Sequence, residues 1–181
     1  MIIGDTVRLR GIDKEDLPLF VSWLNDPDVR RYLSLYTPLS NAQEVKWFED
    51  LANHCLAEQP LMIEVQNEKG WKAVGDISYI NVDQQSRNAE LGVFIGDKEF
   101  WGKGIGTKAI SLMLDYGFKT LNFHRVYLRV FAPNQRGVHC YEKIGFKHEG
   151  NMREAYFLDG EYVDVLFMSI LKEEWRGKSG V

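Results

Sequence analysis

The stretch that decides the fold reads Trp101-Gly102-Lys103-Gly104-Ile105-Gly106-Thr107. It follows a strand-like apolar segment, residues 89–95, and it begins a segment in which apolar residues recur with the helical period. Glycine lets the backbone adopt positive φ and approach a bulky anion, and the free N–H groups at a helix N-terminus offer partial positive charge to phosphate oxygens. The sequence therefore predicts a strand-to-helix turn that can bind a diphosphate.

Two common nucleotide-binding loops do not fit these letters. A P-loop ends in Gly-Lys followed by Ser or Thr, whereas the order here is Gly106-Thr107-Lys108. A Rossmann fingerprint needs an acidic residue ~20 positions further on in a parallel βαβ unit, and residues 122–131 contain no acid. The letters exclude a P-loop and argue against NAD. A tight turn that binds nothing stays open as the structural alternative.

The rest of the chain predicts a mixed α+β fold in the order βααβββαβαββ. Strands are indicated by alternating apolar residues and helices by an apolar face of period 3.6. The predicted strands span 7–10, 61–66, 72–81, 88–95, 124–130, 147–158 and 161–171, and the helices follow Asp13, Ser40, Gly106 and Asn134. The three consecutive strands imply an antiparallel meander, and Asp159-Gly160 is a dipeptide that a type I′ hairpin turn prefers.

The helix expected from Ser40 to about Glu58 has the clearest local signals. Ser40 and Gln43 are spaced as a capping box, in which each residue satisfies a free backbone N–H at the helix start. The apolar spacing predicts a buried stripe made of Val45, Phe48, Ala52 and Cys55.

Length and composition favour one globular domain. With 181 residues, 45% hydrophobic and 27% charged, the chain suits a single domain over residues 1–176 and a frayed tail over 177–181. The net charge is −4 and the 22 basic residues are scattered, so we expect no nucleic-acid partner. The absence of a basic leader and of a long apolar run predicts no membrane association and a cytoplasmic location.

Neither the two cysteines nor the four histidines form a metal-binding pattern, and we expect no metal. Cys140 follows His139, but adjacent positions on a helix point apart, which argues against a Cys–His nucleophile. Cys140 is expected to be a small buried apolar residue.

A second informative segment is Asn134-Gln135-Arg136-Gly137-Val138-His139-Cys140-Tyr141-Glu142-Lys143-Ile144-Gly145-Phe146. Together with the G-x-G loop, its N-x-x-G-x-x-x-Y-x-x-x-G-F pattern closely resembles the two signature motifs of GNAT acetyltransferases. The resemblance covers nearly the whole chain. Its C-terminal part, from residues 114–118 to Asp159-Gly160, is similar to the branch that holds ribosomal-protein alanine and spermidine N-acetyltransferases.

This resemblance implies a GNAT-like twisted, largely antiparallel sheet flanked by helices, with acetyl-CoA as the acetyl donor. Trp101 departs from the Gln or Arg usual at its position, so diphosphate binding would fall to backbone N–H groups, helped by the charge of Lys103. The end of strand 88–95 would splay from strand 124–130 to receive the pantetheine arm. The implied cofactor contacts are Val93, Phe94, Ile95, Trp101, Gly102, Lys103, Gly104, Ile105, Gly106, Thr107, Asn134 and Tyr141.

An amine must lose a proton before it attacks a thioester, because alkylamines have pKa values near ~10.4. Glu90, on the strand before the loop, is the candidate base and would act through one water, while a solvated surface charge is the equally open alternative. Tyr141 would assist departure of the thiolate, and a core tyrosine is its alternative. No covalent enzyme intermediate is required, because a ternary complex can orient both substrates.

The acceptor amine is expected near the first two helices and loop 30–38. A protein N-terminus, as for ribosomal-protein acetylases, is the first expectation, and a polyamine or amino sugar is the alternative. A catalytically silent CoA-binding regulatory module is the alternative from another class, against which Tyr141 and Glu90 argue. The resemblance also raises the expectation of a homodimer.

Overall fold

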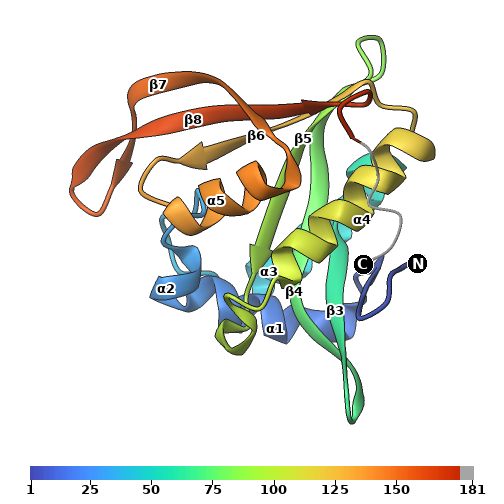
Figure 1. The fold of residues 1–181 in the computed structure, drawn as a ribbon. Helices are drawn as coiled ribbons and strands as arrows, with labels where there is room; N and C mark the ends of the chain where they lie inside the picture. The colour runs from blue at the N-terminus through green and yellow to red at the C-terminus, as the bar shows by residue number, and fades with distance from the viewer. Residues whose placement is uncertain (176–181) are drawn as a thin grey trace.

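The computed structural model describes residues 1–175, so the tail predicted for residues 177–181 lies outside the described part. One mixed sheet with the strand order β1-β2-β3-β4-β5-β6-β8-β7 runs through the molecule (Figure 1). Its strands are β1 (Ile2–Ile3), β2 (Val7–Gly11), β3 (Leu61–Asn67), β4 (Gly70–Asp83), β5 (Asn88–Ile95), β6 (Arg125–Phe131), β7 (Lys147–Leu158) and β8 (Glu161–Leu171). All neighbours pair antiparallel except β5 and β6.

Helices cover both faces of this sheet. The α-helices are α1 (Leu17–Asn25), α2 (Pro27–Arg30), α3 (Asn41–Asp50), α4 (Ile105–Lys119) and α5 (Gln135–Ile144). Short 3₁₀ turns occur at Lys14–Asp16, Leu51–Asn53, Leu56–Glu58 and Lys98–Phe100. α4 and α5 pack on one face with the larger core, and α1 to α3 pack on the other with a smaller aromatic cluster.

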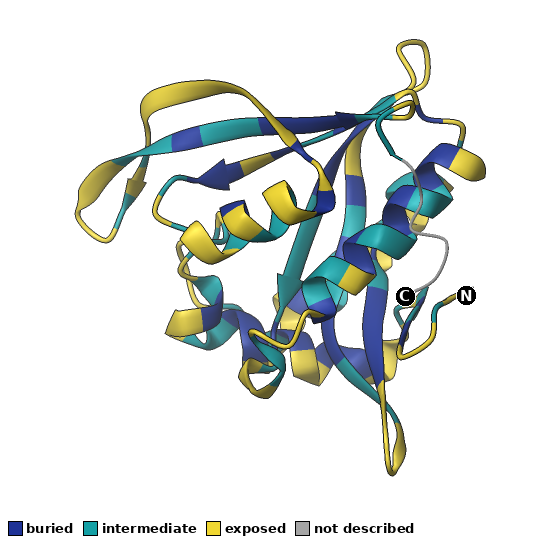
Figure 2. Ribbon diagram, in the orientation of Figure 1, coloured by how far each residue is buried: buried dark blue, intermediate teal, exposed yellow. Residues whose placement is uncertain are grey.

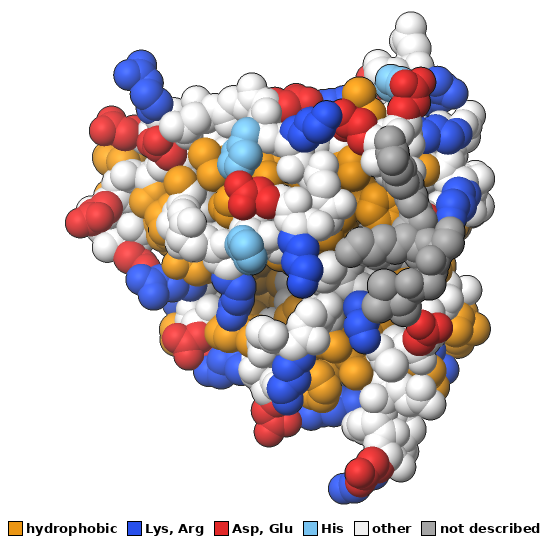
Figure 3. Space-filling view, in the orientation of Figure 1, with side chains coloured by type: hydrophobic (Ala, Val, Ile, Leu, Met, Phe, Trp, Pro, Cys, Tyr) orange, Lys and Arg blue, Asp and Glu red, His pale blue; other side chains and the backbone are white. Residues whose placement is uncertain are grey.

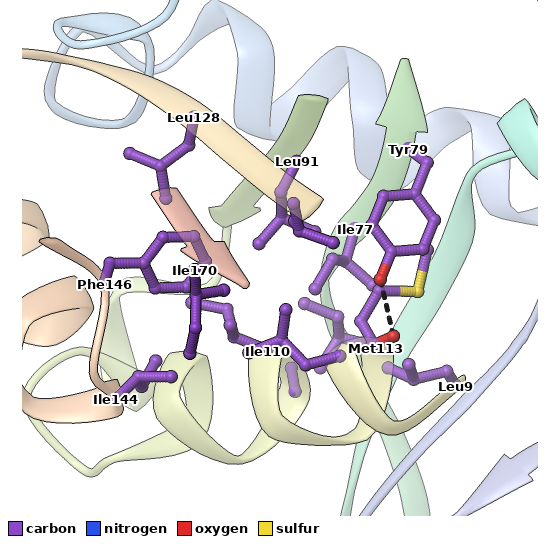
Figure 4. Packing of buried hydrophobic residues seen from close by; sticks show 14 of the residues in the cluster. Leu9, Ile77, Tyr79, Leu91, Ile110, Met113, Leu128, Ile144, Phe146 and Ile170 are labelled. Atoms are coloured by element: carbon purple, nitrogen blue, oxygen red, sulfur yellow. Dashed lines mark hydrogen bonds between the residues drawn. The ribbon is translucent and has the colours of Figure 1, made fainter. Parts of the chain in front are cut away.

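The larger core joins α4 to the sheet. In Figure 4, Leu9, Ile77 and Leu91 of the sheet lie close to Ile110 and Met113 of α4, and all five side chains are buried. Full burial of each such side chain contributes about 1.5–3 kcal/mol. The sheet thereby holds α4, and with it the glycine loop, in a fixed position.

One polar contact fixes the orientation of α4 within this core. The buried Tyr79 hydroxyl donates a hydrogen bond of 2.6 Å to the Met113 carbonyl (Figure 4). A buried hydroxyl without a partner would be costly, so this bond favours one seating of the helix.

β5 and β6 separate after a short parallel ladder. They pair only at Asn88–Arg125, Ala89–Val126 and Glu90–Tyr127, and then diverge (Figure 1). Over the diverging part β5 stays bonded to β4, and β6 stays bonded to β8. The facing backbone edges of β5 and β6 are therefore open to a ligand, as the splay expected from the sequence requires.

The predicted fold class and the order of the long elements are confirmed, including the antiparallel meander and the β7–β8 hairpin. Asp159 and Gly160 both have positive φ, as a type I′ turn requires. Two short elements were not predicted, namely β1 and α2. α1 ends at Asn25, and Pro27 begins the separate short helix α2, because proline suits the first helical turn and the Asp26 carboxylate accepts from the Asp28 N–H.

The prediction for α3 was partly wrong. Its capping box at Ser40 and Gln43 is present, but the helix ends at Asp50 rather than near Glu58. The expected stripe is buried only in part: Val45 and Phe48 are half-buried, but Ala52 and Cys55 are exposed. Glu44, by contrast, is only 4% exposed. Two 3₁₀ turns change the helical phase after Asp50, so the apolar spacing extrapolated to Cys55 does not apply.

Candidate active site

A cleft of about 710 Å³ lies where β5 and β6 separate. Its walls come from the glycine loop, α5, the segment after α2 and the β7–β8 hairpin. Every residue predicted for the site lines this cleft except Lys103, whose Nζ lies 5.3 Å from the centroid of the Phe100 ring. Segments far apart in the sequence thus meet at one hollow.

The glycine loop presents free amides to the cleft. Gly104, the N-cap of α4, has φ of 76°, and its carbonyl accepts the first intrahelical hydrogen bond, from the Lys108 N–H at 3.1 Å. The N–H groups of Ile105, Gly106 and Thr107 precede that bond and have no intrahelical acceptor. A Cβ at Gly104 would meet no protein atom within 4 Å, so backbone conformation, not packing, requires glycine there.

Trp101 ties this loop to the end of β5. Its indole Nε1–H donates to the Ile95 carbonyl at 2.7 Å. The Arg136 guanidinium carbon lies 4.0 Å from the centroid of the Trp101 ring, a cation–π distance, and Arg136 lines the cleft. The sequence analysis missed Arg136, because only the tertiary structure brings the start of α5 against the loop.

Asn134 caps α5 and also lines the cleft. Its Oδ1 accepts a hydrogen bond of 3.0 Å from the Gly137 N–H, which leaves the amide NH₂ available to a ligand. A Cβ at Gly137 would come within 2.8 Å of Asn134 Nδ2. The N-x-x-G spacing therefore has a local cause, since glycine makes room for the capping side chain.

Tyr141 lies on the cleft side of α5. It is half-buried, and its hydroxyl makes no hydrogen bond to any described residue. Burial raises the pKa of this phenol, so it stays protonated at neutral pH and can donate a hydrogen bond.

The neighbouring Cys140 is a poor nucleophile. Its Sγ lies 3.3 Å from Thr107 Oγ1, and burial raises the pKa of the thiol. The reactive thiolate is therefore disfavoured.

Glu90 is buried at the point where the strands separate. Its carboxylate accepts from Arg129 Nε at 2.7 Å and Nη2 at 3.1 Å, and from Asn81 Nδ2 at 2.9 Å. Three donors thus occupy a group that has about four lone-pair positions. The carboxylate is held in one orientation and can accept one further hydrogen bond from the cleft. Arg129, another cleft residue that the sequence analysis missed, is 48% exposed.

The far end of the cleft is closed by contacts between distant segments. Tyr32, Leu33 and Ser34 line it, within the loop expected to meet the acceptor. Tyr36 stacks on Tyr156 of β7 at 5.8 Å between ring centroids.

Two polar contacts join the end of α2 to the hairpin turn and to the segment before α5. Arg31 forms an ion pair of 3.2 Å with Asp159 in the hairpin turn, and the Tyr32 hydroxyl donates to the Pro133 carbonyl at 3.4 Å. These exposed contacts are individually weak, so the wall they form is adaptable. β7 itself is exposed along almost its whole length (Figure 2).

Other kinds of site find little support in the described residues. Within residues 1–175 no group of three or more His, Cys, Asp or Glu side chains is arranged to hold a metal ion. In the same part of the chain, every helix is too short or too polar to cross a membrane. On the face drawn in Figure 3, basic and acidic side chains are interspersed rather than gathered into one block.

Comparison with known families agrees with this geometry. The model of the acetyltransferase (GNAT) domain matches residues 6–147. The chain belongs to the GNAT acetyltransferase family. Membership confirms the predicted family, the fold class and the acetyltransferase activity.

Two of the proteins that match nearly the whole chain are spermidine N-acetyltransferases. Spermidine N(1)-acetyltransferase of Escherichia coli K12 is 31% identical over 170 residues, covering 94% of this chain and 88% of that protein. The crystal structure of spermidine N-acetyltransferase from Vibrio cholerae, in complex with CoA and spermine, has a TM-score of 0.84 at 30% identity and covers 95% of this GNAT chain and 99% of its own.

A relative named for acetylation of ribosomal proteins matches a shorter segment of the chain. YdaF of Bacillus subtilis, provisionally named a ribosomal N-acetyltransferase, is 39% identical over 104 residues, which is 58% of this chain and 56% of YdaF. The comparisons therefore favour the small-molecule alternative over the protein N-terminus that was the first expectation for this GNAT enzyme's acceptor.

Proposed function

We propose that this chain is an acetyl-CoA-dependent N-acetyltransferase whose acceptor is a small amine of the polyamine class. The carrying observation is the cleft between the separated β5 and β6, which has free helix N-terminal amides at one end and both Glu90 and Tyr141 on its walls. The similarity of the chain to spermidine N-acetyltransferases supports the choice of a polyamine as the acceptor.

The residues present fit acetyl-CoA as the donor, which supplies a thioester carbonyl when bound. Free N–H groups of Ile105, Gly106 and Thr107 at the start of a 15-residue helix offer positive potential to a diphosphate. Arg136, seated on Trp101, adds a full positive charge beside them. The open edge of β5 and the Asn134 amide provide hydrogen-bonding groups for an extended pantetheine arm.

Glu90 serves in this proposal as the proton acceptor for the amine, directly or through one water. The carboxylate is fixed by Arg129 and Asn81, and its remaining lone pair is the position for that hydrogen bond. Fixing the group in advance removes an orientation cost from the reaction.

Tyr141 serves as the donor to the departing sulfur. Its hydroxyl has no competing partner among the described residues, and its raised pKa keeps the proton in place until negative charge develops on the acceptor atom. No nucleophilic side chain takes part, in line with the disfavoured Cys140 thiolate.

The test is a free-thiol assay with acetyl-CoA and four acceptors: spermidine, glucosamine, a monoamine and a peptide with an N-terminal alanine. We expect the highest kcat/KM with spermidine. Thiol release with the peptide alone would contradict the proposed acceptor class. Failure of all acceptors, combined with calorimetric binding of CoA, would favour the regulatory module instead. The homodimer stays a prediction, and light scattering of the purified protein tests it.

A further inference from the structure

Basic side chains gather on one side of α5. Arg136, His139 and Lys143 follow one another at intervals of three and four residues, a spacing that places them along one side of a helix. All three are exposed, and all three line the cleft. None of them forms an ion pair or a side-chain hydrogen bond with any residue from 1 to 175. Their N–H donors are therefore available to a ligand.

The carboxylates around this side of α5 already have partners. Glu142, the acidic residue of α5, lies outside the cleft lining and contacts His148 of β7 at 2.9 Å. The carboxylates of the cleft lining are Asp28 and Glu90, which pair with a lysine at 2.9 Å and with an arginine at 2.7 Å. The unpaired charges along the described cleft are thus positive, which favours an anionic ligand beside α5.

The middle of this side of α5 contacts the first turn of α4. Thr107 Oγ1, in that turn, lies 3.3 Å from Cys140 Sγ. Arg136, four residues before Cys140, lies over Trp101, and Lys143 follows Cys140 by three residues. About 10 Å of helix separates Arg136 from Lys143, with the contact to α4 between them. The two cations therefore lie on either side of the position where α5 meets the free amides of α4.

Lys143 lies at the end of α5 that is remote from the proposed acceptor wall. The Tyr32 hydroxyl, in that wall, donates to the carbonyl of Pro133, just before the helix begins at Gln135. From Gln135 to Lys143 the helix rises about 12 Å. A ligand group that meets Lys143 therefore belongs to the acetyl donor rather than to the amine.

The proposed donor carries two separate anionic groups, the diphosphate and a phosphate monoester at the ribose 3′ position. The amides of α4 and the Arg136 guanidinium suit the diphosphate. A phosphate monoester has a charge of about −1.5 to −2 at neutral pH and three acceptor oxygens. A lysine offers a positive charge with three donors, and a histidine ring offers an N–H. Lys143 and His139, four residues apart on α5, match the second group.

We propose that Lys143 and His139 form a subsite for the 3′-phosphate of the acetyl donor. The inference rests on the proposed function and deepens it, because it names the part of the donor that this end of α5 recognises. The subsite selects CoA over 3′-dephospho-CoA, which has the same diphosphate and the same thiol. It acts on binding of the donor and takes no part in the transfer of the acetyl group.

The experiment is calorimetric titration of the protein with CoA and with 3′-dephospho-CoA. We expect wild type to bind CoA about 10-fold more tightly, because charge-assisted hydrogen bonds to phosphate are stronger than neutral ones. Lys143→Gln should weaken CoA binding about 5-fold and change binding of 3′-dephospho-CoA by less than about 2-fold, since only CoA carries the group that the lysine meets. His139→Ala should weaken CoA binding about 2-fold in the same selective way.

Two further variants serve as controls. Lys46→Gln removes the same charge from an exposed position of α3 outside the cleft lining, and it should leave both affinities unchanged. Arg136→Ala should weaken both ligands by the same factor, because both carry the diphosphate that Arg136 is proposed to meet.

Two outcomes would overturn the subsite. Equal affinity of wild type for CoA and 3′-dephospho-CoA means that the 3′-phosphate has no partner in the protein. Equal weakening of both ligands in Lys143→Gln places this lysine at the diphosphate instead.

The same titrations separate the subsite from the proposed function. A preference for CoA that is present in wild type and lost in Lys143→Gln supports the subsite even where no amine is acetylated. Acetylation of spermidine, combined with equal binding of the two ligands, rejects the subsite and leaves the proposed function standing. Absence of binding heat with CoA in wild type rejects both.

Discussion

The two ends of the cleft are built in different ways. The proposed donor end depends on local features, namely the glycines before α4, the Asn134 cap and the helix that carries Tyr141. The acceptor end depends on contacts between segments far apart in the chain, such as Arg31 with Asp159 and Tyr36 with Tyr156. A local motif keeps its geometry when the rest of the chain changes, whereas an assembled wall can change one residue at a time. Substitutions at the proposed acceptor end are therefore expected to leave the proposed donor end unchanged.

Loss of the Tyr141 hydroxyl, at the proposed donor end, should have the largest effect on the rate of the reaction. We expect Tyr141→Phe to lower kcat about 100-fold, because general acid assistance contributes about 10²- to 10⁴-fold. The KM values for acetyl-CoA and amine should stay nearly constant, since the ring remains in place against Phe146. Steady-state kinetics with each substrate varied in turn measures this. Full activity of the variant would remove Tyr141 from the mechanism.

Replacing Asp76 on β4, outside the cleft lining, tests through stability how strongly burial acts on a carboxyl of the sheet. The pKa of this carboxyl is raised from 3.8 to about 7 in the folded protein, so the folded state binds its proton more tightly than the unfolded state. The unfavourable contribution of the ionised group is therefore absent below about pH 4 and grows as the pH rises to about 7. The negative charge of Glu44, a residue of α3, adds to this rise of the pKa.

We expect Asp76→Asn to raise the free energy of unfolding at pH 8 by on the order of 2 kcal/mol relative to wild type. The gain should shrink towards zero at pH 4. Urea unfolding at both pH values checks this, with the exposed Glu49→Gln as the control. An equal change in the free energy of unfolding at the two pH values would mean that folding does not raise the pKa of this carboxyl.

Arg136 and Lys103 offer a sharper test of the donor end, because the sequence favoured Lys103 and the structure favours Arg136. Arg136 lines the cleft on the face of Trp101, whereas Lys103 lies outside the lining. We expect Arg136→Ala to raise the KM for acetyl-CoA about 5-fold, near 1 kcal/mol, without changing the KM for the amine. Lys103→Ala should change neither by more than about 2-fold. The reverse ranking would restore the expectation from the sequence.

The smallest change in KM is expected for the stacked pair Tyr36 and Tyr156, at the proposed acceptor end. Tyr36→Ala removes the stack on Tyr156, and such aromatic pairs contribute about 0.5–1.5 kcal/mol. We expect the KM for the amine to rise about 3-fold while the KM for acetyl-CoA stays constant. Tyr162→Ala, which breaks a similar contact with Phe157 outside the cleft, is the matched control. A change in the acetyl-CoA KM would show that the two ends are coupled.

The sequence predicted the donor end well because its signals are local. The helix cap at Asn134 and the turn at Gly104 each depend on residues within four positions of one another. That these residues bind a cofactor remains a proposal, although the structure places them in one cleft.

The acceptor end was predicted poorly because its contacts are not local. Arg129 meets Glu90 across 39 positions, and Arg31 meets Asp159 across 128. Apolar periodicity also failed in α3, where it assigned the inner face to residues as far as Cys55 although Glu44 is buried there. Periodicity assumes that only apolar groups face inward, and a buried charge violates that assumption.

The fork between β5 and β6 bears on how this enzyme meets its substrates. Over the length in which the two strands diverge, β5 stays hydrogen-bonded to β4 and β6 stays hydrogen-bonded to β8. The gap thus exists before any molecule enters, and arrival of the donor requires no rupture of backbone bonds. In the proposed mechanism, a preformed gap of this kind suits rapid exchange of the coenzyme, and it leaves adjustment during turnover to the weakly joined segments around Tyr32 and Tyr156.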